Sequence, residues 1–218
     1  MKIAALLLSL LVTTSLAHEV WIEDTPDGQL VVRFAEYGDD FEKTPGGLDM
    51  LSLPAAWTAA AEGKVTAFNV EKKTDHFLLT GASPKSPVQS ETGFSVMGKA
   101  GNPEKPARKP FFYARWHVAG SPSEPALTFD IVPAATAGEA TVFFRGKPTA
   151  GVNVKLYLPD GDEQEITSDE AGKVRYTATK PGLYMMAAAH QRETVPGFSG
   201  GKAYDVVSHN CSVAWRQP

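Results

Sequence analysis

The segment VNVKLYL (residues 152–158) is followed by the turn PDG (159–161) and then by EQEIT (163–167). Apolar and polar side chains alternate along VNVKLYL, which is typical of a strand that buries one face. Pro-Asp-Gly favours a chain reversal, because proline fixes one backbone angle while aspartate and glycine tolerate the remaining turn conformations. These residues therefore predict two antiparallel strands joined by a hairpin.

Similar strands, separated by turn sequences at intervals of about ten residues, fill the C-terminal half of the chain. The further strands expected there are residues 141–145, 173–177, 183–190 and 204–215, with turns at 146–148 and 169–172. This spacing predicts an antiparallel β-sandwich.

The N-terminal half carries weaker signals of the same kind. Residues 20–23 and 29–35 predict a hairpin around the turn TPDG (25–28), and residues 111–118 predict a further strand. The alanine-rich residues 51–61 favour a short helix instead.

The stretch PAATAGE (133–139) begins with proline and contains small and polar residues. Such a composition is typical of a linker between domains. The sequence thus predicts an all-β chain with two antiparallel β-sandwich domains, residues 18–132 and residues 140–218.

Composition narrows the range of partners. The chain has 25 acidic and 21 basic residues, a net charge of −4, which argues against nucleic acid or an anionic membrane surface as a partner. After residue 17 no apolar run approaches the about 20 residues of a membrane-spanning helix, so no membrane insertion is expected. A single cysteine, Cys211, excludes a disulfide within the chain.

The first 17 residues have the features of a signal peptide. Lys2 precedes an apolar run at residues 3–12, and the small residues Ser15 and Ala17 precede the expected cleavage point. Cleavage there would leave His18 with two adjacent nitrogen ligands, its α-amine and its imidazole. With a second imidazole, such a residue can form a T-shaped copper or nickel site; the alternative is that His18 is an ordinary polar residue.

Further candidate metal ligands lie near the C-terminus and in residues 111–118. Strands 183–190 and 204–215 are consecutive, so they are expected to pair and to bring His190 close to His209. Cys211 lies two residues beyond His209 and therefore on the same strand face, while His117 lies on a polar face that we expect to meet solvent or a cleft. Nitrogen and sulfur ligands of this kind suit copper, nickel, zinc or cobalt.

The alternative is that each histidine forms only local hydrogen bonds and that Cys211 is a small core residue. The acidic stretch EYGDDFE (36–42) lacks the ligand spacing of a calcium loop, and we interpret it as a solvated turn. No catalytic residue is predicted, since residues 198–201 (FSGG) lack a nucleophile-elbow pattern.

Two resemblances add to these expectations. The stretches GKPTAGVNV (146–154), DEAGK (169–173) and PGLY (181–184) resemble the turns of the transthyretin-like or carboxypeptidase-regulatory-like sandwich, which implies an Ig-like second domain. Together with the Ala-His junction at residues 17–18, Trp21 and the Ala-His pair at 189–190, the chain resembles a bacterial periplasmic family described as the periplasmic component of cobalt and nickel transport.

The resemblance implies a periplasmic protein that takes part in cobalt and nickel uptake and cooperates with a membrane metal transporter, and the chemistry of an N-terminal histidine adds copper as a candidate ion. Our first hypothesis is therefore a transition-metal binding protein that serves metal uptake or buffering, with His18, His190, His209, His117 and Cys211 as candidate ligands. The second is a non-metal binding module that contacts carbohydrate, the cell envelope or another protein. A copper-dependent oxidase that uses the N-terminal histidine is the third.

Overall fold

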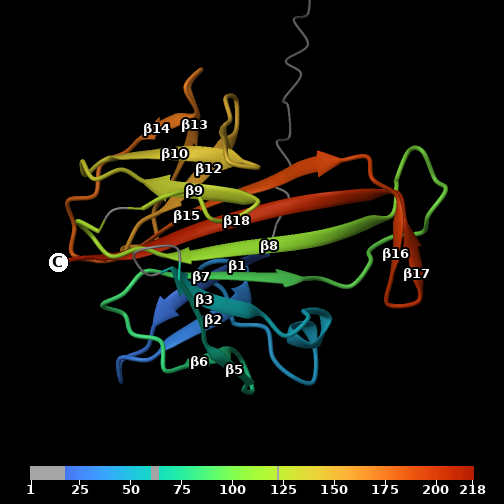
Figure 1. Cartoon of the computed structure of the whole chain (residues 1–218), viewed down its shortest axis with the longest axis horizontal. Coiled ribbons are helices and arrows are strands. Elements are labelled where there is room, and N and C mark those ends of the chain that lie inside the picture. The colour runs from blue at the N-terminus through green and yellow to red at the C-terminus, as the bar shows by residue number, and fades with distance from the viewer. Residues whose placement is uncertain (1–17, 60–63, 122) are drawn as a thin grey trace, which may run out of the picture.

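The computed structural model describes residues 18–59, 64–121 and 123–218, with the backbone alone for Ala59 and His190. The expected signal peptide, residues 1–17, lies outside the described residues. Almost all regular structure is β (Figure 1), which confirms the all-β, sandwich-type fold. No helix in the described ranges has the length and apolar character needed to cross a membrane.

A mixed sheet of eight strands forms the middle layer of the molecule (Figure 1). Across the sheet the strands are β13 (Glu163–Thr167), β12 (Asn153–Tyr157), β15 (Gly182–Glu193), β18 (Val206–Gln217), β8 (Arg108–Trp116), β7 (Val88–Gly93), β3 (Ala55–Ala59) and β4 (Val65–Ala67). Strands β18 and β8 pair in parallel, whereas their neighbours pair antiparallel.

Two smaller sheets cover the opposite faces of this central sheet. One contains β1 (Glu19–Asp24), β2 (Leu30–Ala35), β6 (Phe77–Thr80) and β5 (Asn69–Lys72). The other contains β11 (Lys147–Pro148), β10 (Glu139–Phe144), β14 (Lys173–Arg175) and β9 (Phe129–Pro133). A short hairpin, β16 (Gly197–Ser199) and β17 (Lys202–Tyr204), and the 3-10 helix η1 (Gly47–Met50) complete the described elements.

Each smaller sheet encloses its own hydrophobic core against the central sheet. The first core joins Trp21 and Phe34 to Phe112 and Ala214, and the second joins Phe129 to Val213. Consecutive residues of β18 and β8 therefore contribute to different cores, because successive side chains of a strand point to opposite faces. The middle strands of the central sheet, β18 and β8, are thus largely buried on both faces, whereas the edge strands β13 and β4 are mostly exposed.

The expected linker has a different structure. Residues 133–139 form the hairpin turn between β9 and β10, where Pro133 pairs with Ala140. Strand β8 precedes this turn in the sequence and strand β18 follows it, yet both belong to the central sheet. The two strands pair along nine residues, from Val206 with Arg108 to Ala214 with Trp116. The two halves therefore share one sheet instead of standing on either side of a flexible segment.

The expected short helix at residues 51–61 is wrong for its described part. Ala55–Ala59 is strand β3, which pairs with β7 on one side and β4 on the other. Alanine favours a helix only weakly, and the backbone hydrogen bonds of a sheet override that preference.

Candidate binding site at His18

His18 lies immediately before β1, beside the acidic stretch that follows β2. Its Nε2 atom lies 2.7 Å from Oε1 of Glu42. Its ring centroid lies 5.1 Å from that of Phe34, and the amide of Glu42 donates a hydrogen bond to the carbonyl oxygen of Phe34. The side chain of His18 is nevertheless 42% exposed. The imidazole is thus held on two sides and remains open to solvent.

An acidic hollow of about 630 Å³ opens next to this histidine. It is bordered by His18, Glu36, Gly38, Asp39, Asp40 and Glu42. Gly38 has a φ of 95°, a conformation that suits glycine and lets the chain turn sharply after β2. No lysine or arginine borders this hollow among the described residues, so its carboxylates favour cations. Sequence reasoning interpreted these acids as a solvated turn, because nothing local placed them beside His18.

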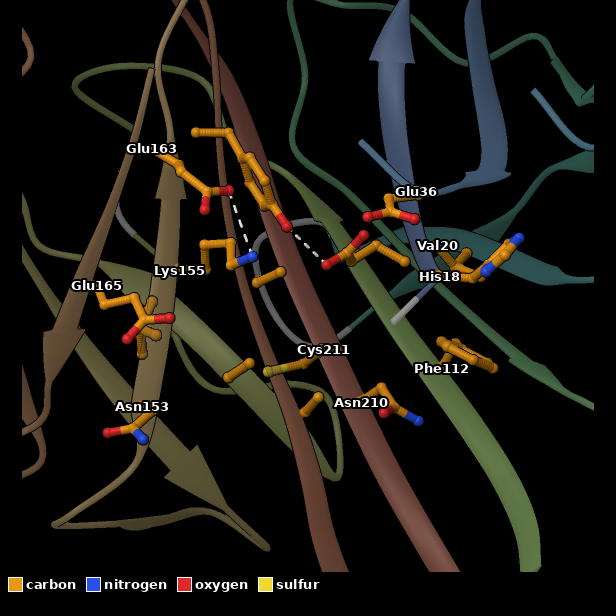
Figure 2. A pocket seen from close by; sticks show the side chains of 16 residues that line it. His18, Val20, Glu36, Phe112, Asn153, Lys155, Glu163, Glu165, Asn210 and Cys211 are labelled. Carbon is orange, nitrogen blue, oxygen red and sulfur yellow. Dashed lines mark hydrogen bonds and ion pairs between the residues drawn. The ribbon is translucent and has the colours of Figure 1, made fainter. Parts of the chain in front are cut away.

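A second hollow, a cleft of about 610 Å³, lies between β1 and the strands β12 and β13 (Figure 2). The hydroxyl of Tyr157 donates a hydrogen bond to Oε1 of Glu19 at 2.7 Å, and Nζ of Lys155 lies 3.3 Å from Oε2 of Glu163. Burial raises the pKa of Glu19 above its ordinary value. Burial, together with the adjacent Glu19 carboxylate, also raises the pKa of Tyr157.

His209 belongs to the opposite face of the central sheet. Its Nε2 atom lies 2.9 Å from Oε2 of Glu193 and its Nδ1 atom lies 3.0 Å from the hydroxyl of Tyr113. The ring packs against Phe144 at 5.2 Å, and burial lowers the pKa of His209. Arg145 donates hydrogen bonds to the same Glu193 carboxylate. Both ring nitrogens are therefore engaged beside a fixed cation, which disfavours a metal ion here.

Cys211 and His117 lie on the same face of the central sheet as His209, but each occupies a different place on that face. Cys211 borders the cleft, yet it packs in the second core, and burial raises the pKa of its thiol well above the ordinary value. His117 lies six residues beyond Phe111, the strand partner of His209, a separation of about 20 Å at about 3.3 Å per residue. Burial and the charge of Arg115 lower the pKa of His117 to about 4.

His117 was expected to face solvent or a cleft. It borders a hollow of about 250 Å³, but its side chain is buried, with Nδ1 3.3 Å from Oγ of Ser123. The backbone of His190 lies in β15 at a register shift between Ala188 and Gln191, and its side chain lies outside the described atoms.

The structure therefore does not bring the described side chains of His18, His117, His209 and Cys211 together around one point. Within the described ranges, no three His, Cys, Asp or Glu side chains converge as they would around a metal ion. The reason is the alternation of β18: Ser212 faces β1 and donates a hydrogen bond to the carbonyl oxygen of Val20, so Cys211 and His209 face away from β1 and from His18.

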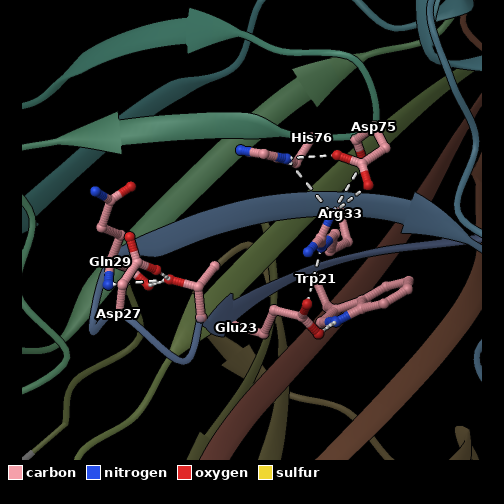
Figure 3. A network of polar contacts seen from close by, with 8 residues as sticks. Trp21, Glu23, Asp27, Gln29, Arg33, Asp75 and His76 are labelled. Atoms are coloured by element: carbon pink, nitrogen blue, oxygen red, sulfur yellow. Dashed lines mark hydrogen bonds and ion pairs between the residues drawn. The ribbon is translucent and has the colours of Figure 1, made fainter.

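His76 also pairs with a carboxylate, and its position beside Asp75 in the sequence is typical of a turn histidine held by its neighbour. Its Nδ1 atom lies 2.7 Å from Oδ1 of Asp75, and the guanidinium of Arg33 lies 3.2 Å from the other oxygen of that carboxylate (Figure 3). Arg33 also donates to Glu23, which in turn accepts the indole N–H of Trp21. This network joins β1, β2 and the β5–β6 turn and is structural, so Trp21 anchors the first strand.

No family model matches the chain, and no curated protein matches it either. The fold and the two hollows that His18 borders describe an all-β, sandwich-type protein with an acidic surface at the start of its first strand.

Proposed function

We propose that this chain is a periplasmic protein that binds a divalent transition-metal ion, nickel, cobalt or copper, at His18. It would buffer the ion or pass it to a membrane metal transporter. The observation that carries this proposal is the His18–Glu42 pair at the mouth of the acidic hollow. His209 and His117 have no part in it, because they lie elsewhere in the fold, and Cys211 has none because its buried thiol stays protonated and its side chain packs away from β1.

The distance within the pair supports a shared ion. Two ligand atoms held at about 2.1 Å from one metal ion at right angles lie about 3 Å apart. The 2.7 Å between Nε2 of His18 and Oε1 of Glu42 is close to that value. A metal ion bound by both groups would take the place of this hydrogen bond, with the two ligand atoms kept at a similar separation and the imidazole turned so that its Nε2 lone pair points at the ion.

Signal-peptide cleavage after Ala17 would add the third donor. The freed α-amine of His18 titrates near pH 8, so a metal ion can displace its proton at neutral pH. Glu36, Asp39 and Asp40 border the same hollow and would raise the local concentration of cations. Imidazole, amine and carboxylate form a set of intermediate softness, which suits nickel, cobalt, copper or zinc.

The exposure of the site favours ion transfer. Because His18 is partly exposed and Glu42 borders an open hollow, an incoming ligand from a transporter can approach the ion directly. Release would then proceed by stepwise ligand exchange, in which each protein donor is replaced by one from the partner.

Calorimetric titration of protein exported and processed by its own host, with Cu²⁺, Ni²⁺ and Co²⁺ in turn, tests the proposal. We expect one-to-one binding that His18→Ala abolishes and that Glu42→Gln weakens by about tenfold or more. One additional residue before His18 should also weaken binding, because it removes the free α-amine. His76→Ala is the matched control, since His76 pairs with a carboxylate at the same distance beside Arg33.

Equal metal affinity for the wild type and the His18→Ala variant would contradict the proposal. So would a loss of binding in His76→Ala that matches the loss in His18→Ala.

The second candidate function is a binding module without a metal ion, and one surface feature favours it. Phe198 is 72% exposed on the short β16–β17 hairpin, which projects from the end of the long strands (Figure 1). An exposed aromatic ring at such a tip suits contact with a carbohydrate or another protein. Phe198→Ser would then abolish retention on envelope fractions while leaving metal affinity unchanged; unchanged retention would exclude a role for this ring.

A further inference from the structure

The cleft on the β12 side of His18 differs from the acidic hollow in its size and in its mixed lining. We propose that it binds a small organic cation, an ammonium or guanidinium group on a compact apolar body, with the cationic group against Glu19. This site adjoins the metal site and shares His18 and Glu36 with it as bordering residues, but its recognition group, Glu19, belongs to the cleft and not to the acidic hollow.

The charged groups of the cleft favour a positive ligand. Four glutamates border it, Glu19, Glu36, Glu163 and Glu165, against the single lysine Lys155. Lys155 is paired with Glu163 at 3.3 Å. Within the described chain neither Glu36 nor Glu165 belongs to an ion pair, and Glu36 lies close enough to Glu19 to repel its charge. A cation between the walls would offset this repulsion.

Glu19 supplies the specific recognition group. Its Oε1 atom accepts the hydroxyl of Tyr157, and the backbone amide of Tyr37 lies close enough to stabilise the carboxylate. Its Oε2 atom is buried and has no hydrogen-bond partner of ordinary geometry in the described structure. Buried polar atoms normally have a partner, and a buried charged oxygen without one is costly. A ligand N–H that enters beside Tyr157 would satisfy this oxygen through a charge-assisted hydrogen bond.

The remaining lining suits an apolar body. Val20, Val154, Ala187 and Ala188 are buried apolar residues at the cleft, and the amides of Asn153 and Asn210 border it. The alanines leave space because their side chains are short. A volume of about 610 Å³ lies within the range of about 300–1,000 Å³ typical of sites for small organic molecules. A bare metal ion would leave most of this cleft empty.

Three probes of one shape separate charge from size: benzylamine, benzyl alcohol and benzoate. Each is titrated into the isotope-labelled, processed protein, and binding is followed by NMR shifts of backbone amides at the cleft. We expect benzylamine to bind with shifts at β1, β12 and β15, and the neutral and anionic probes to bind at least about tenfold more weakly.

Two variants locate the binding. Glu19→Gln keeps the shape of the side chain and should weaken benzylamine binding by about tenfold or more, whereas Glu71→Gln, a change of an exposed glutamate on β5, should leave it unchanged. Ala189→Trp, at an exposed position that borders the cleft, should block the probe without touching any carboxylate. Circular dichroism of each variant confirms that the fold is kept.

Equal binding of benzoate and benzylamine would overturn the proposal, as would full benzylamine binding in Glu19→Gln, or no shift with any probe. Glu42→Gln separates the two sites: it should weaken metal binding and leave benzylamine binding intact. Failure of the metal site alone would therefore be distinguishable from failure of the cleft.

Discussion

His18 and His209 each pair with a glutamate, at 2.7 Å and 2.9 Å, and each packs against a phenylalanine ring, yet the two side chains differ in their exposure and in how many ring nitrogens are engaged. The His209 side chain is 4% exposed, has both ring nitrogens engaged and lies among aromatic rings. The His18 side chain is 42% exposed and borders two hollows. A histidine–glutamate pair is therefore a structural contact at His209, on one face of the central sheet, and a candidate binding group at His18, on the other face.

The sheet face that carries His209 contains polar contacts that are buried away from solvent. Arg115 and Asp130 are both buried there, with hydrogen bonds of 3.0 Å and 2.6 Å between guanidinium and carboxylate. Asp130 also accepts the backbone amides of Ala126 and Leu127. The buried polar groups on this face therefore need one another as hydrogen-bond partners, whereas the polar groups around His18 can also bind water.

The largest effect is expected from Asp130→Ala. The substitution leaves the Arg115 guanidinium buried without its counter-charge, so we expect the free energy of unfolding to fall by about 3–5 kcal/mol. Urea denaturation followed by circular dichroism measures the loss. Asp24→Ala, which breaks the exposed pair with Arg216, is the control and should cost at most about 1 kcal/mol. Similar losses of unfolding free energy in both variants would show that the buried Arg115–Asp130 pair stabilises the fold no more than an exposed pair does.

His209→Ala should have the next largest effect. It removes one hydrogen bond from the Tyr113 hydroxyl and one from the Glu193 carboxylate, which keeps its contacts with Arg145, and it opens a cavity beside Phe144. We therefore expect a loss of about 2–4 kcal/mol in the free energy of unfolding. Metal affinity measured by calorimetry should stay at the wild-type value. A stable variant that no longer binds metal would reverse our assignment of the two histidines.

The local elements of the chain could be predicted because they depend on neighbouring residues. The segment EQEIT is strand β13 over the expected residues 163–167, and β1, β2, β12, β15 and β18 differ from the expected ranges by at most three residues at an end. Turn residues such as Pro159 and Gly161 specify these reversals without any help from distant parts of the chain.

The arrangement of the site could not be predicted in this way. Alternation correctly placed His209 and Cys211 on one face of β18, but both faces of that strand are largely buried, so the pattern does not say which face meets His18. The parallel pairing of β18 with β8 joins residues about a hundred positions apart. The contact of His18 with Glu42 likewise depends on how β2 and its following turn lie against β1.

A smaller effect is expected in the pH dependence of stability, and it arises from the buried His117. In the unfolded chain the pKa of His117 has its ordinary value of 6.5, whereas burial lowers it to about 4 in the fold. The unfolded state therefore binds more protons between these values, and the free energy of unfolding falls as the pH decreases from 6.5 toward 4. Because the ring borders a hollow, we expect His117 to account for on the order of 1–2 kcal/mol.

Urea titrations of the wild type and of His117→Gln across that pH range measure this contribution. The difference in stability between the two proteins should change with pH in the stated direction. A pH-independent difference would mean that His117 takes up its proton equally well in the folded and unfolded states.

The smallest change in stability is expected from His18→Ala. This imidazole is partly exposed, and its contacts are one ring packing with Phe34 and one hydrogen bond to Glu42, so the free energy of unfolding should change by less than about 1 kcal/mol. Metal binding should nevertheless be lost. A residue that contributes little to folding yet determines binding is expected at a functional surface, because selection there acts on the ligand and not on the packing. If His18→Ala instead destabilised the protein as much as His209→Ala, His18 would be a structural anchor for β1, and the metal proposal would lose its only side chain with a nitrogen donor.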